Sequence, residues 1–547
     1  MARIVLSSEG VRREMQSGVT QMSKTLHSWI SEAADRAPTN EAVVGEDVTM
    51  TYGDIEEYSS RLAATLRAHG CRKGDRVAIA MPTSARAVAS LIGVLKAGCA
   101  YVPLDLTGAL SRVAQMIDQC EPKAVLFAGC GPQVVDNLEV RGALRGSALG
   151  WLDGSAEPPP AMTFASNDVW GASPDGALAR VTEHDLAYIL FTSGTTGSPK
   201  GVPITHGNVR AFIGWAIDYF GLGPRDRLSG HTALTFDLST FDVYATFAAG
   251  ASLHHVPSRV RMMPHQVADF IEERELTLWF SVPSQLAYVA RFHGLEARHP
   301  SSLRHVAWCG DVLHTPSLCY WKRHLPGVAF TNLYGPTETT VASSYHRVPD
   351  DFDDPNADVP IGIPLPGEEL LVLDDELRRV PPGEVGDIYI KGVGLSVGYW
   401  RDPERTAAAF LPAPGANGDG ARMYRTGDRG RLQPDGTVAF LGRSDFQIKT
   451  NGYRVEPAEV ENAILQLDEV AACAVVPLAA ADFSGTVIGC AYVSSNGHPL
   501  RAAEVKKRLG DRLPSYMIPS RWLVLEDLPV DTRGKVDRGR ARALLGG

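Results

Sequence analysis

The sequence lacks the features that define several large classes of protein. Its 547 residues include eight cysteines, but these are scattered and no two form a C-x-x-C pair. A disulfide framework or a structural zinc site is therefore not indicated, and a reducing compartment fits better. No run reaches the roughly 18 apolar residues that a membrane helix needs. The N-terminus has no long apolar centre of a signal peptide, so we expect a cytoplasmic protein without a membrane partner.

Basic blocks and repeats are absent as well. The formal net charge is −10, and no cluster of Lys and Arg indicates nucleic acid as a partner. No segment recurs at a fixed period, which excludes a solenoid or a propeller. With 44% apolar and 21% charged residues, the composition is that of an ordinary globular protein. The chain is too long for one core, so we expect at least two domains.

Strand and helix patterns alternate over most of the chain. "DRVAIAMP" and "AVLFAG" are typical of buried strands, and "SRLAATLRAHG" of a helix that ends at Gly70. Residues 131–185 are rich in Gly, Pro and Ala, and we expect a surface excursion there before the sheet resumes at "LAYILFTSG". Such alternation predicts parallel β-α-β units with buried strands.

The pattern changes near residue 360. "GEELLVLDDELRRVPPGEVGDIYIKG" and "GRLQPDGTVAFLG" predict hairpins, the second with Asp-Gly at its turn. The predicted fold class is therefore α/β, with a large N-terminal domain of two βα-type, parallel-rich sheets plus an antiparallel β subdomain. We place this domain at residues 1–443 and a small, mobile α+β C-terminal domain at residues 444–547.

The stretch "YILFTSGTTGSPKG" at residues 188–201 is typical of a phosphate-binding loop. It follows a strand, its glycines let backbone N–H groups approach an anion, and Lys200 adds a positive charge. It is not a Walker loop, because the G-x-x-x-x-G-K-[ST] spacing is missing. On the pattern alone, a plain flexible turn remains an equal alternative.

Further motifs follow in order, among them "LKAGCAYVPLD", "FDLSTFDVY", "NLYGPTETT", "YRTGDRGRL", "GRSDFQIKTNGYRVEPAEVE" and "TRGKVDR". Together with "FTSGTTGSPKG" they resemble the adenylate-forming (ANL) superfamily: acyl-CoA synthetases, luciferases and nonribosomal-peptide adenylation domains. The resemblance covers nearly the whole chain and is nearest to a freestanding amino-acid adenylation domain of the peptide-synthetase type. It implies ATP as substrate and Mg²⁺ as cofactor.

The resemblance assigns an ATP or AMP contact to residues of the loop and of three later motifs. These are Thr192, Ser193, Gly194, Thr195, Thr196, Gly197, Lys200, Asn332, Tyr334, Gly335, Asp428 and Arg443. Tyr334 would stack on adenine, Asp428 would bind both ribose hydroxyls and Arg443 would contact the ribose. Read locally, Tyr334 is as well explained as a core ring.

Three residues are implied to be catalytic. Thr337 would approach the α-phosphate, and Glu338 would hold Mg²⁺, a hard cation suited to one carboxylate plus phosphate oxygens. Lys535 would bridge the substrate carboxylate and the α-phosphate, neutralising the transition state. Without the family context, Lys535 would be an ordinary surface charge.

The C-terminal motif implies a change of arrangement between two half-reactions. Asp445 stands at the position of the hinge. A second closed state would bring Lys449 and Gly452 to the active site, where Gly452 gives a pantetheine thiol room to approach. Asn451 stands where many relatives have Arg, which puts a charge contact from that position in doubt.

Asp237 indicates what kind of acid is activated. It stands where the amino-acid branch pairs with the substrate ammonium; a helix-capping Asp is the structural alternative. A buried carboxylate facing an aryl or fatty acyl group would be unpaired, which disfavours those substrates. The remaining positions carried over to the pocket are Leu238, Phe241, Ser284, Ala307, Cys309, Leu333, Val341, Ala342 and Lys535.

Apart from Asp237 and Lys535 the pocket is uncharged, which predicts a small neutral amino acid, with L-alanine first and serine, cysteine, proline or a small β-amino acid as alternatives. No carrier segment follows "ARALLGG", so we expect a monomeric, freestanding enzyme that loads a separate carrier protein, with coenzyme A as the other candidate acceptor. An acyl- or aryl-CoA synthetase is the alternative enzyme, and an inactive adenylate-binding scaffold is the alternative from another class.

Overall fold

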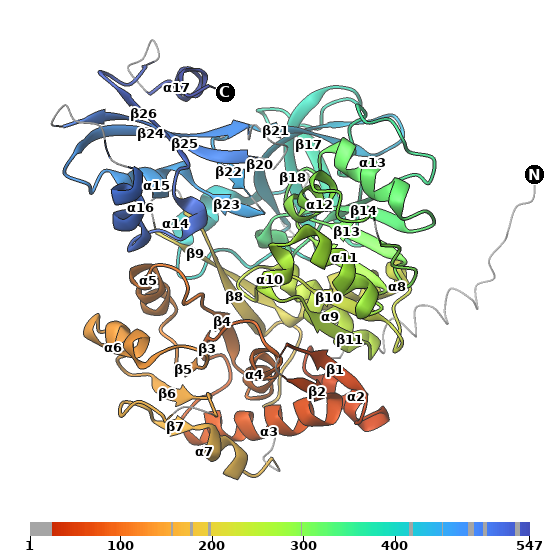
Figure 1. The fold of residues 1–547 in the computed structure, drawn as a ribbon, viewed down its shortest axis with the longest axis vertical. Helices are drawn as coiled ribbons and strands as arrows, with labels where there is room; N and C mark the ends of the chain where they lie inside the picture. The colour runs from red at the N-terminus through yellow and green to blue at the C-terminus, as the bar shows by residue number, and fades with distance from the viewer. Residues whose placement is uncertain are drawn as a thin grey trace, which may run out of the picture.

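The computed structural model of the chain describes residues 25–46, 48–154, 157–174, 179–194, 198–296, 298–414, 420–450, 452–479, 486–495, 500, 502–530 and 536–546. Two parallel-rich sheets with their helices make up most of the molecule, and an antiparallel sheet and a small C-terminal unit lie at the other end (Figure 1). None of the helices in these ranges is long and apolar enough to cross a membrane.

The first large sheet has nine strands in the order β16-β15-β14-β13-β12-β10-β11-β1-β2. Its centre is parallel, and only the pairings β1·β2, β14·β15 and β15·β16 are antiparallel. The strands are β1 (Glu41–Val44), β2 (Thr49–Thr51), β10 (Arg227–Gly230), β11 (Ser252–His255), β12 (Leu278–Ser281), β13 (His305–Trp308), β14 (Ala329–Tyr334), β15 (Ser344–Arg347) and β16 (Ile363–Pro364).

The second large sheet has seven strands in the order β7-β6-β5-β3-β4-β8-β9, with only β8·β9 antiparallel. The strands are β3 (Arg76–Ala80), β4 (Ala100–Pro103), β5 (Ala124–Phe127), β6 (Ala148–Trp151), β7 (Phe164–Ala165), β8 (Leu186–Thr192) and β9 (Lys200–Thr205). The expectation of a surface excursion over residues 131–185 was wrong in part, because β6 and β7 extend this sheet. Both are short and Gly- or Ala-containing, so the pairing of β6 with β5, and of β7 with β6, comes from tertiary context rather than from propensity.

Helices cover both faces of the two sheets. They are α2 (Ser28–Arg36), α3 (Tyr52–Ala68), α4 (Ala85–Lys96), α5 (Leu110–Cys120), α6 (Pro132–Val140), α7 (Ser166–Gly171), α8 (His206–Phe220), α9 (Leu238–Ala249), α10 (Ser258–Arg261), α11 (Pro264–Glu273), α12 (Pro283–Arg291) and α13 (Thr315–His324). Residues of α3, α4, α8 and α9 share one apolar cluster with strands of both sheets, so these helices lie between the sheets.

Strand β3 shows why the sequence gives buried parallel strands. Val77 and Ile79 pack in the cluster between the sheets, whereas Ala78 and Ala80 pack in a separate cluster with α5 and α6. Successive side chains of a strand point to opposite faces, so a strand covered on both faces must be apolar at every position. This explains the unbroken run in "DRVAIAMP".

The antiparallel sheet has the order β17-β18-β20-β19, with β21 paired to β20. Its elements are β17 (Glu368–Leu373), β18 (Val385–Gly392), α14 (Pro403–Ala409), β19 (Phe410–Pro412), β20 (Arg422–Leu432) and β21 (Val438–Arg443). Both predicted hairpins are present, β17·β18 and β20·β21. The fold class is therefore the predicted one.

The C-terminal unit begins with the hairpin of β22 (Ile448–Thr450) and β23 (Tyr453–Val455). A mixed sheet of three strands follows, in the order β24-β25-β26. The remaining elements are α15 (Pro457–Ile464), β24 (Val470–Ala479), β25 (Thr486–Ser494), α16 (Ala502–Gly510), β26 (Arg521–Leu525) and α17 (Arg538–Leu544). In Figure 1 this unit lies above α5 of the N-terminal part.

Candidate active site

The predicted phosphate loop joins β8 to β9 at the edge of the seven-stranded sheet. The structure describes four of its predicted residues, Thr192, Ser193, Gly194 and Lys200, while Thr195, Thr196 and Gly197 lie outside the described residues. The Thr192 hydroxyl is buried and has no hydrogen-bond partner among the described groups. A buried hydroxyl without a partner is costly, so it marks a position where a ligand oxygen would be accommodated.

Glu338 is the centre of a buried cluster of charges beside this loop. Its side chain is fully buried, 3.2 Å from Lys200 Nζ and 2.9 Å from Arg454 Nη1. The Tyr399 hydroxyl also donates to it at 2.8 Å. Burial alone would raise the pKa of Glu338, but Arg454 and Lys200 outweigh burial and hold the pKa far below its usual range. The two cations therefore stabilise the ionised form of Glu338.

This carboxylate fits the role predicted for Mg²⁺ binding. Among the described residues no group of three His, Cys, Asp or Glu side chains forms a complete ligand set. Mg²⁺ is commonly held by one or two carboxylates, with substrate phosphates and waters as the other ligands. Glu338 offers one ionised carboxylate next to a phosphate loop, which is what such a site needs.

The residues predicted to bind adenosine lie together at the ends of β14 and β21 and in the middle of β20. The Tyr334 hydroxyl donates to Asp428 Oδ2 at 2.6 Å, and Arg443 Nη1 donates to Asp428 Oδ1 at 2.6 Å. Arg443 also forms two hydrogen bonds with Asp445, of 2.6 and 2.7 Å. Asp428, the carboxylate predicted to bind the ribose, is thus connected through Arg443 to Asp445, the predicted hinge residue.

A small cavity of about 40 Å³ opens beside Tyr334. Asn332 and Gly335 line it, as the resemblance implies for an adenine site. Lys449 from the C-terminal hairpin also lines it, with its Nζ 5.9 Å from the centre of the Tyr334 ring. Asp311, which follows β13 in "CGD", is a further wall residue that the sequence patterns did not indicate.

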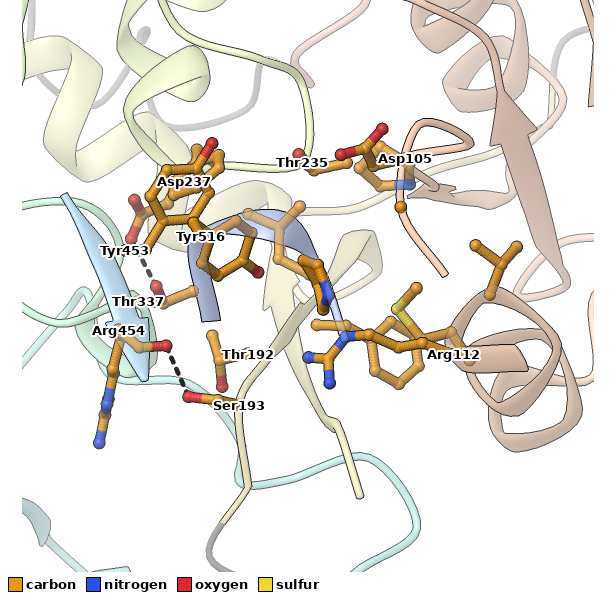
Figure 2. A pocket seen from close by; sticks show the side chains of 18 of the residues that line it. Asp105, Arg112, Thr192, Ser193, Thr235, Asp237, Thr337, Tyr453, Arg454 and Tyr516 are labelled. Carbon is orange, nitrogen blue, oxygen red and sulfur yellow. Dashed lines mark hydrogen bonds between the residues drawn. The ribbon is translucent and has the colours of Figure 1, made fainter. Parts of the chain in front are cut away.

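Asp237 immediately precedes α9, yet its side chain does not cap that helix. The Thr337 hydroxyl instead donates to Asp237 Oδ2 at 2.7 Å (Figure 2). This hydrogen bond joins the carboxylate predicted to bind the substrate ammonium to a predicted catalytic residue. Burial raises the pKa of Asp237 to about 6. Burial of an ionised carboxylate costs free energy, and a cationic partner would offset that cost. Because the side chain makes no capping hydrogen bond, the capping alternative is not supported.

Seven of the predicted pocket positions belong to the apolar cluster between the two sheets. They are Leu238, Phe241, Ala307, Cys309, Leu333, Val341 and Ala342. The ring of Phe241 is fully buried and packs against Phe212, Phe220 and Phe280 at centroid distances of 6.2, 5.6 and 4.7 Å. The cavity that Asp237 lines includes none of these seven side chains, so their place in a substrate pocket stays a prediction. Ser284, at the start of α12, is half-buried.

The chain makes a strained turn at two of the predicted pocket positions, Val341 and Ala342. Thr340 and Val341 have φ values of 62° and 68°, and the Ala342 N–H donates to the Thr340 carbonyl at 2.8 Å. Left-handed backbone is unusual for β-branched residues and costs free energy. The Thr340 hydroxyl donates to the Gly394 carbonyl at 2.7 Å, and the Cys309 thiol donates to the Val341 carbonyl at 3.5 Å. These two contacts hold the turn.

A cavity of about 130 Å³ runs from Asp237 and Thr337 toward the C-terminal unit. Gly452 and Tyr453 of the hairpin line it, and Tyr453 stacks on Tyr516 at 3.6 Å (Figure 2). Gly452 has φ +80°, and a Cβ there would meet Val282 Cγ1 at 2.4 Å. Both the backbone and the packing therefore require glycine at this position.

Lys535 lies outside the described residues, so its position in the cavity is not given. The described residues on either side, Val530 and Val536, form a β-bridge with each other. Val536 packs on Ala474, Ala491 and Ala541, on the face of the C-terminal sheet that α17 covers. Among the described residues of the C-terminal unit, Gly452, Tyr453 and Arg454 of the hairpin, together with Pro514 and Tyr516, line the cavity that contains Asp237.

The sequence patterns missed several residues that the structure brings to the site. Arg454 and Glu459 lie in the quoted motif "GYRVEPAEVE", but only Lys449 and Gly452 were selected from that region. Arg112 of α5 forms an ion pair with Glu459 across the two units, and both side chains are largely buried. The charges of Arg454 and Glu459 within this motif were the available signal. The sequence could not predict that Glu459 pairs with Arg112, because Arg112 lies on a distant helix.

The site combines a loop typical of phosphate binding, the buried carboxylate of Glu338 with two cations, and the buried carboxylate of Asp237. This combination is typical of an adenylate-forming enzyme. The comparisons agree. Residues 30–400 match the AMP-binding enzyme family, and residues 459–535 match the AMP-binding enzyme C-terminal domain. The chain belongs to the AMP-binding enzyme family, and it is similar to the adenylation domains of nonribosomal peptide synthetases.

Similar proteins include the L-proline--[L-prolyl-carrier protein] ligase of Streptomyces coelicolor, 35% identical over 91% of this chain and 92% of that protein. A probable non-canonical nonribosomal peptide synthetase, CymA of Salinispora arenicola, is 35% identical over 92% of this chain, which spans only 6% of CymA. Among solved structures, the amide bond synthetase McbA from Marinactinospora thermotolerans matches with a TM-score of 0.84 at 25% identity, over 95% of this chain and 99% of that one.

Proposed function

We propose that this protein is an amino acid–[carrier protein] ligase that works in natural-product biosynthesis. It would join a small neutral amino acid to AMP with release of pyrophosphate, and then pass the aminoacyl group to the phosphopantetheine thiol of a separate carrier protein. The observation that carries the proposal is Asp237, a buried carboxylate that caps no helix and lies 2.7 Å from Thr337. It is placed to pair with the ammonium group of an amino acid.

In the first step, a substrate carboxylate oxygen attacks the α-phosphorus of ATP and the bond to pyrophosphate breaks. Lys200 and the loop N–H groups would hold the β- and γ-phosphates, and Thr337 would contact the α-phosphate. Tyr334, Asp428 and Arg443 would hold the nucleoside. Mg²⁺, when bound at Glu338, supplies positive charge to the phosphates. Lys535 would stabilise the transition state after the C-terminal unit, 444–547, has turned about Asp445.

In the second step, the acceptor thiolate attacks the carbonyl carbon of the adenylate and AMP leaves. The 130 Å³ cavity supports access of a thiol to the adenylate, because it connects Asp237 with the junction of the two units along Gly452. At that junction Arg112 also lines a second, polar cavity of about 480 Å³. Three further arginines line the second cavity, Arg141, Arg508 and Arg512. Such a lining suits the phosphate of a phosphopantetheine arm.

The pocket favours a small side chain. Phe241 and its aromatic neighbours close the far end, and no pocket position apart from Asp237 and Lys535 carries a charge. L-Alanine is the first candidate. L-Proline is the second, because the carrier protein ligase that resembles this chain over most of both sequences is named for proline.

Pyrophosphate exchange with a panel of amino acids tests the proposal. We expect exchange with alanine or proline and no exchange with fatty or aryl acids. The exchange should be lost in Asp237→Ala. Loading of a phosphopantetheinylated carrier protein, compared with coenzyme A, then identifies the acceptor. Exchange driven by a fatty or aryl acid and unchanged in Asp237→Ala would instead identify an acyl-CoA synthetase. No exchange with any acid would favour an inactive scaffold.

A further inference from the structure

Tyr399 joins the lysine of the phosphate loop to the candidate metal ligand. Its hydroxyl donates to Glu338 Oε1 at 2.8 Å and accepts a hydrogen bond of 3.2 Å from Lys200 Nζ. Lys200 Nζ also lies 3.2 Å from the same carboxylate oxygen, so the three polar atoms contact one another. Tyr399 was not among the residues selected from the sequence, and the proposed function gives it no role.

The surroundings of Tyr399 keep its hydroxyl a hydrogen-bond donor. The residue is 8% exposed, and burial together with the neighbouring Glu338 raises the pKa of Tyr399 well above its ordinary value. A phenol that keeps its proton has one hydrogen to donate. The hydroxyl of Tyr424 lies farther away, at 3.4 Å, so the shorter contact with Glu338 takes this hydrogen.

The backbone around Tyr399 fixes the place of the hydroxyl. The Tyr399 N–H donates to Thr406 Oγ1 at 2.9 Å. The next N–H, of Trp400, donates at 2.8 Å to the carbonyl of Gly201 on strand β9. Arg401 follows in left-handed backbone, with φ 53°. Such a conformation costs free energy and persists only where the surrounding structure determines it. The fold, and not the carboxylate alone, therefore holds the hydroxyl in place.

The two oxygens of Glu338 have different neighbours. The Tyr399 hydroxyl and Lys200 Nζ both contact Oε1. Arg454 of the C-terminal unit lies 3.1 Å from Oε1 and 2.9 Å from Oε2. Two donors of the N-terminal part thus fix the carboxylate through Oε1 and turn Oε2 away from themselves. A carboxylate that is oriented in advance by a hydrogen bond is a better metal ligand than one that turns freely.

We infer that Tyr399 is a positioning residue for the metal ligand Glu338. Its hydroxyl holds Glu338 Oε1 and Lys200 in one arrangement, so that the carboxylate presents Oε2 to Mg²⁺. Tyr399 acts through Glu338 and is not itself a ligand of the metal. The inference rests on the proposed function, which assigns the metal to Glu338.

The test measures metal affinity rather than turnover. Mn²⁺ replaces Mg²⁺, and its binding is followed by electron paramagnetic resonance. The protein is saturated with an ATP analogue in which a methylene group replaces the oxygen between the α- and β-phosphorus atoms. Tyr399→Phe keeps the ring and removes the hydroxyl. It is expected to weaken Mn²⁺ binding roughly tenfold to a hundredfold, the usual cost of removing a group that orients a metal ligand. Affinity for the analogue in EDTA should stay that of the wild type.

A double-mutant cycle separates positioning from a general loss of structure. In Glu338→Gln the carboxylate is gone, so adding Tyr399→Phe should cause no further loss of Mn²⁺ affinity. Thr406→Val removes the hydroxyl that accepts the Tyr399 N–H, and it should weaken Mn²⁺ binding in the same direction. Tyr52→Phe is the matched control, because Tyr52 is 1% exposed and its hydroxyl donates to the Ala251 carbonyl at 2.7 Å. It should leave Mn²⁺ affinity unchanged.

Four results would overturn the inference. They are wild-type Mn²⁺ affinity in Tyr399→Phe, an equal loss in Tyr52→Phe, a further loss of the same size in the Glu338→Gln background, and an equal loss of affinity for the metal-free analogue. If Tyr399→Phe does not fold, Thr406→Val decides alone, and unchanged Mn²⁺ affinity in that variant overturns the inference.

The outcome is separable from that of the proposed function, because no amino acid and no carrier protein take part in the Mn²⁺ measurements. If no amino acid supports pyrophosphate exchange while Mn²⁺ affinity falls in Tyr399→Phe, the proposed function fails and the role of Tyr399 stands. If an amino acid is activated while Mn²⁺ affinity is unchanged in that variant, only the role of Tyr399 fails.

Discussion

Replacing Asp237 by Asn should make the folded protein more stable and less active. Burial raises the pKa of this carboxyl from its ordinary value near 3.8 to about 6. Because the folded-state pKa is the higher one, the protonated form is favoured in the fold, and the ionised form at neutral pH costs stability. The cost is about 3 kcal/mol at pH 8 and about half of that at pH 5. Asn carries no charge, so it removes this free-energy cost, and its side-chain oxygen can still accept a hydrogen bond from Thr337.

The measurement is thermal denaturation of Asp237→Asn and wild type at pH 8 and pH 5. With an unfolding entropy of about 2.1 cal/mol/K per residue over a unit of roughly 400 residues, 3 kcal/mol corresponds to a rise in Tm of ~3 °C at pH 8. The rise should shrink toward half at pH 5. Asp218→Asn, at an exposed position of α8, is the control and should leave Tm unchanged.

Activity should change in the opposite direction. Amino-acid-dependent pyrophosphate exchange is expected to be lost in Asp237→Asn, since an amide cannot neutralise a buried ammonium group. In the wild type, the KM for the amino acid should rise by up to tenfold per pH unit below about 6, as Asp237 is protonated. A variant that is less stable at both pH values, with exchange intact, would refute the assignment of Asp237 as a strained binding group.

Three further substitutions test other parts of the site. Asp428→Asn should raise the KM for ATP roughly tenfold to a hundredfold through loss of a charged hydrogen bond to the ribose; an unchanged KM in the exchange assay would contradict this role. Phe241→Leu should open the closed end of the pocket and shift the preference toward longer side chains by roughly tenfold, measured as the ratio of kcat/KM values across the amino-acid panel. Gly452→Ala should keep exchange but lose transfer to the carrier protein, because its Cβ would meet Val282 when the hairpin is docked; loading at the wild-type rate would show that the hairpin does not take part.

The fold was largely predictable because its signals are local. Parallel strands such as β3, β5 and β12 are largely apolar runs, and the Asp-Gly hairpin has its own turn signature. Strands β10 (Arg227–Gly230) and β11 (Ser252–His255) carry few apolar residues, so their place in the sheet comes from tertiary pairing. Strands β6 and β7 were missed because their pairing depends on the neighbouring strand, β5 for β6 and β6 for β7, rather than on their own residues. The boundary after Arg443 and the hinge at Asp445 stay predictions.

The site residues were found through motifs, and most of those described lie together: Tyr334 with Asp428 and Arg443, and Asp237 with Thr337. What the sequence could not predict is which C-terminal residues meet them. Arg454 reaches Glu338 across 116 positions of the chain. That contact depends on how two units dock, which no local pattern encodes.

The strained turn at Thr340 and Val341 has a consequence for how substrate preference can change. Val341 is a predicted pocket position, and two hydrogen bonds hold the main chain there in an unfavourable conformation. One of these bonds ends on Gly394, where a side chain would meet the Thr339 carbonyl at 2.7 Å. Substitutions at Thr340 or Gly394 can therefore move the pocket wall without altering a residue that touches the amino acid. Selection for a new substrate, in nature or in the laboratory, can act on this turn from outside the set of residues that line the pocket.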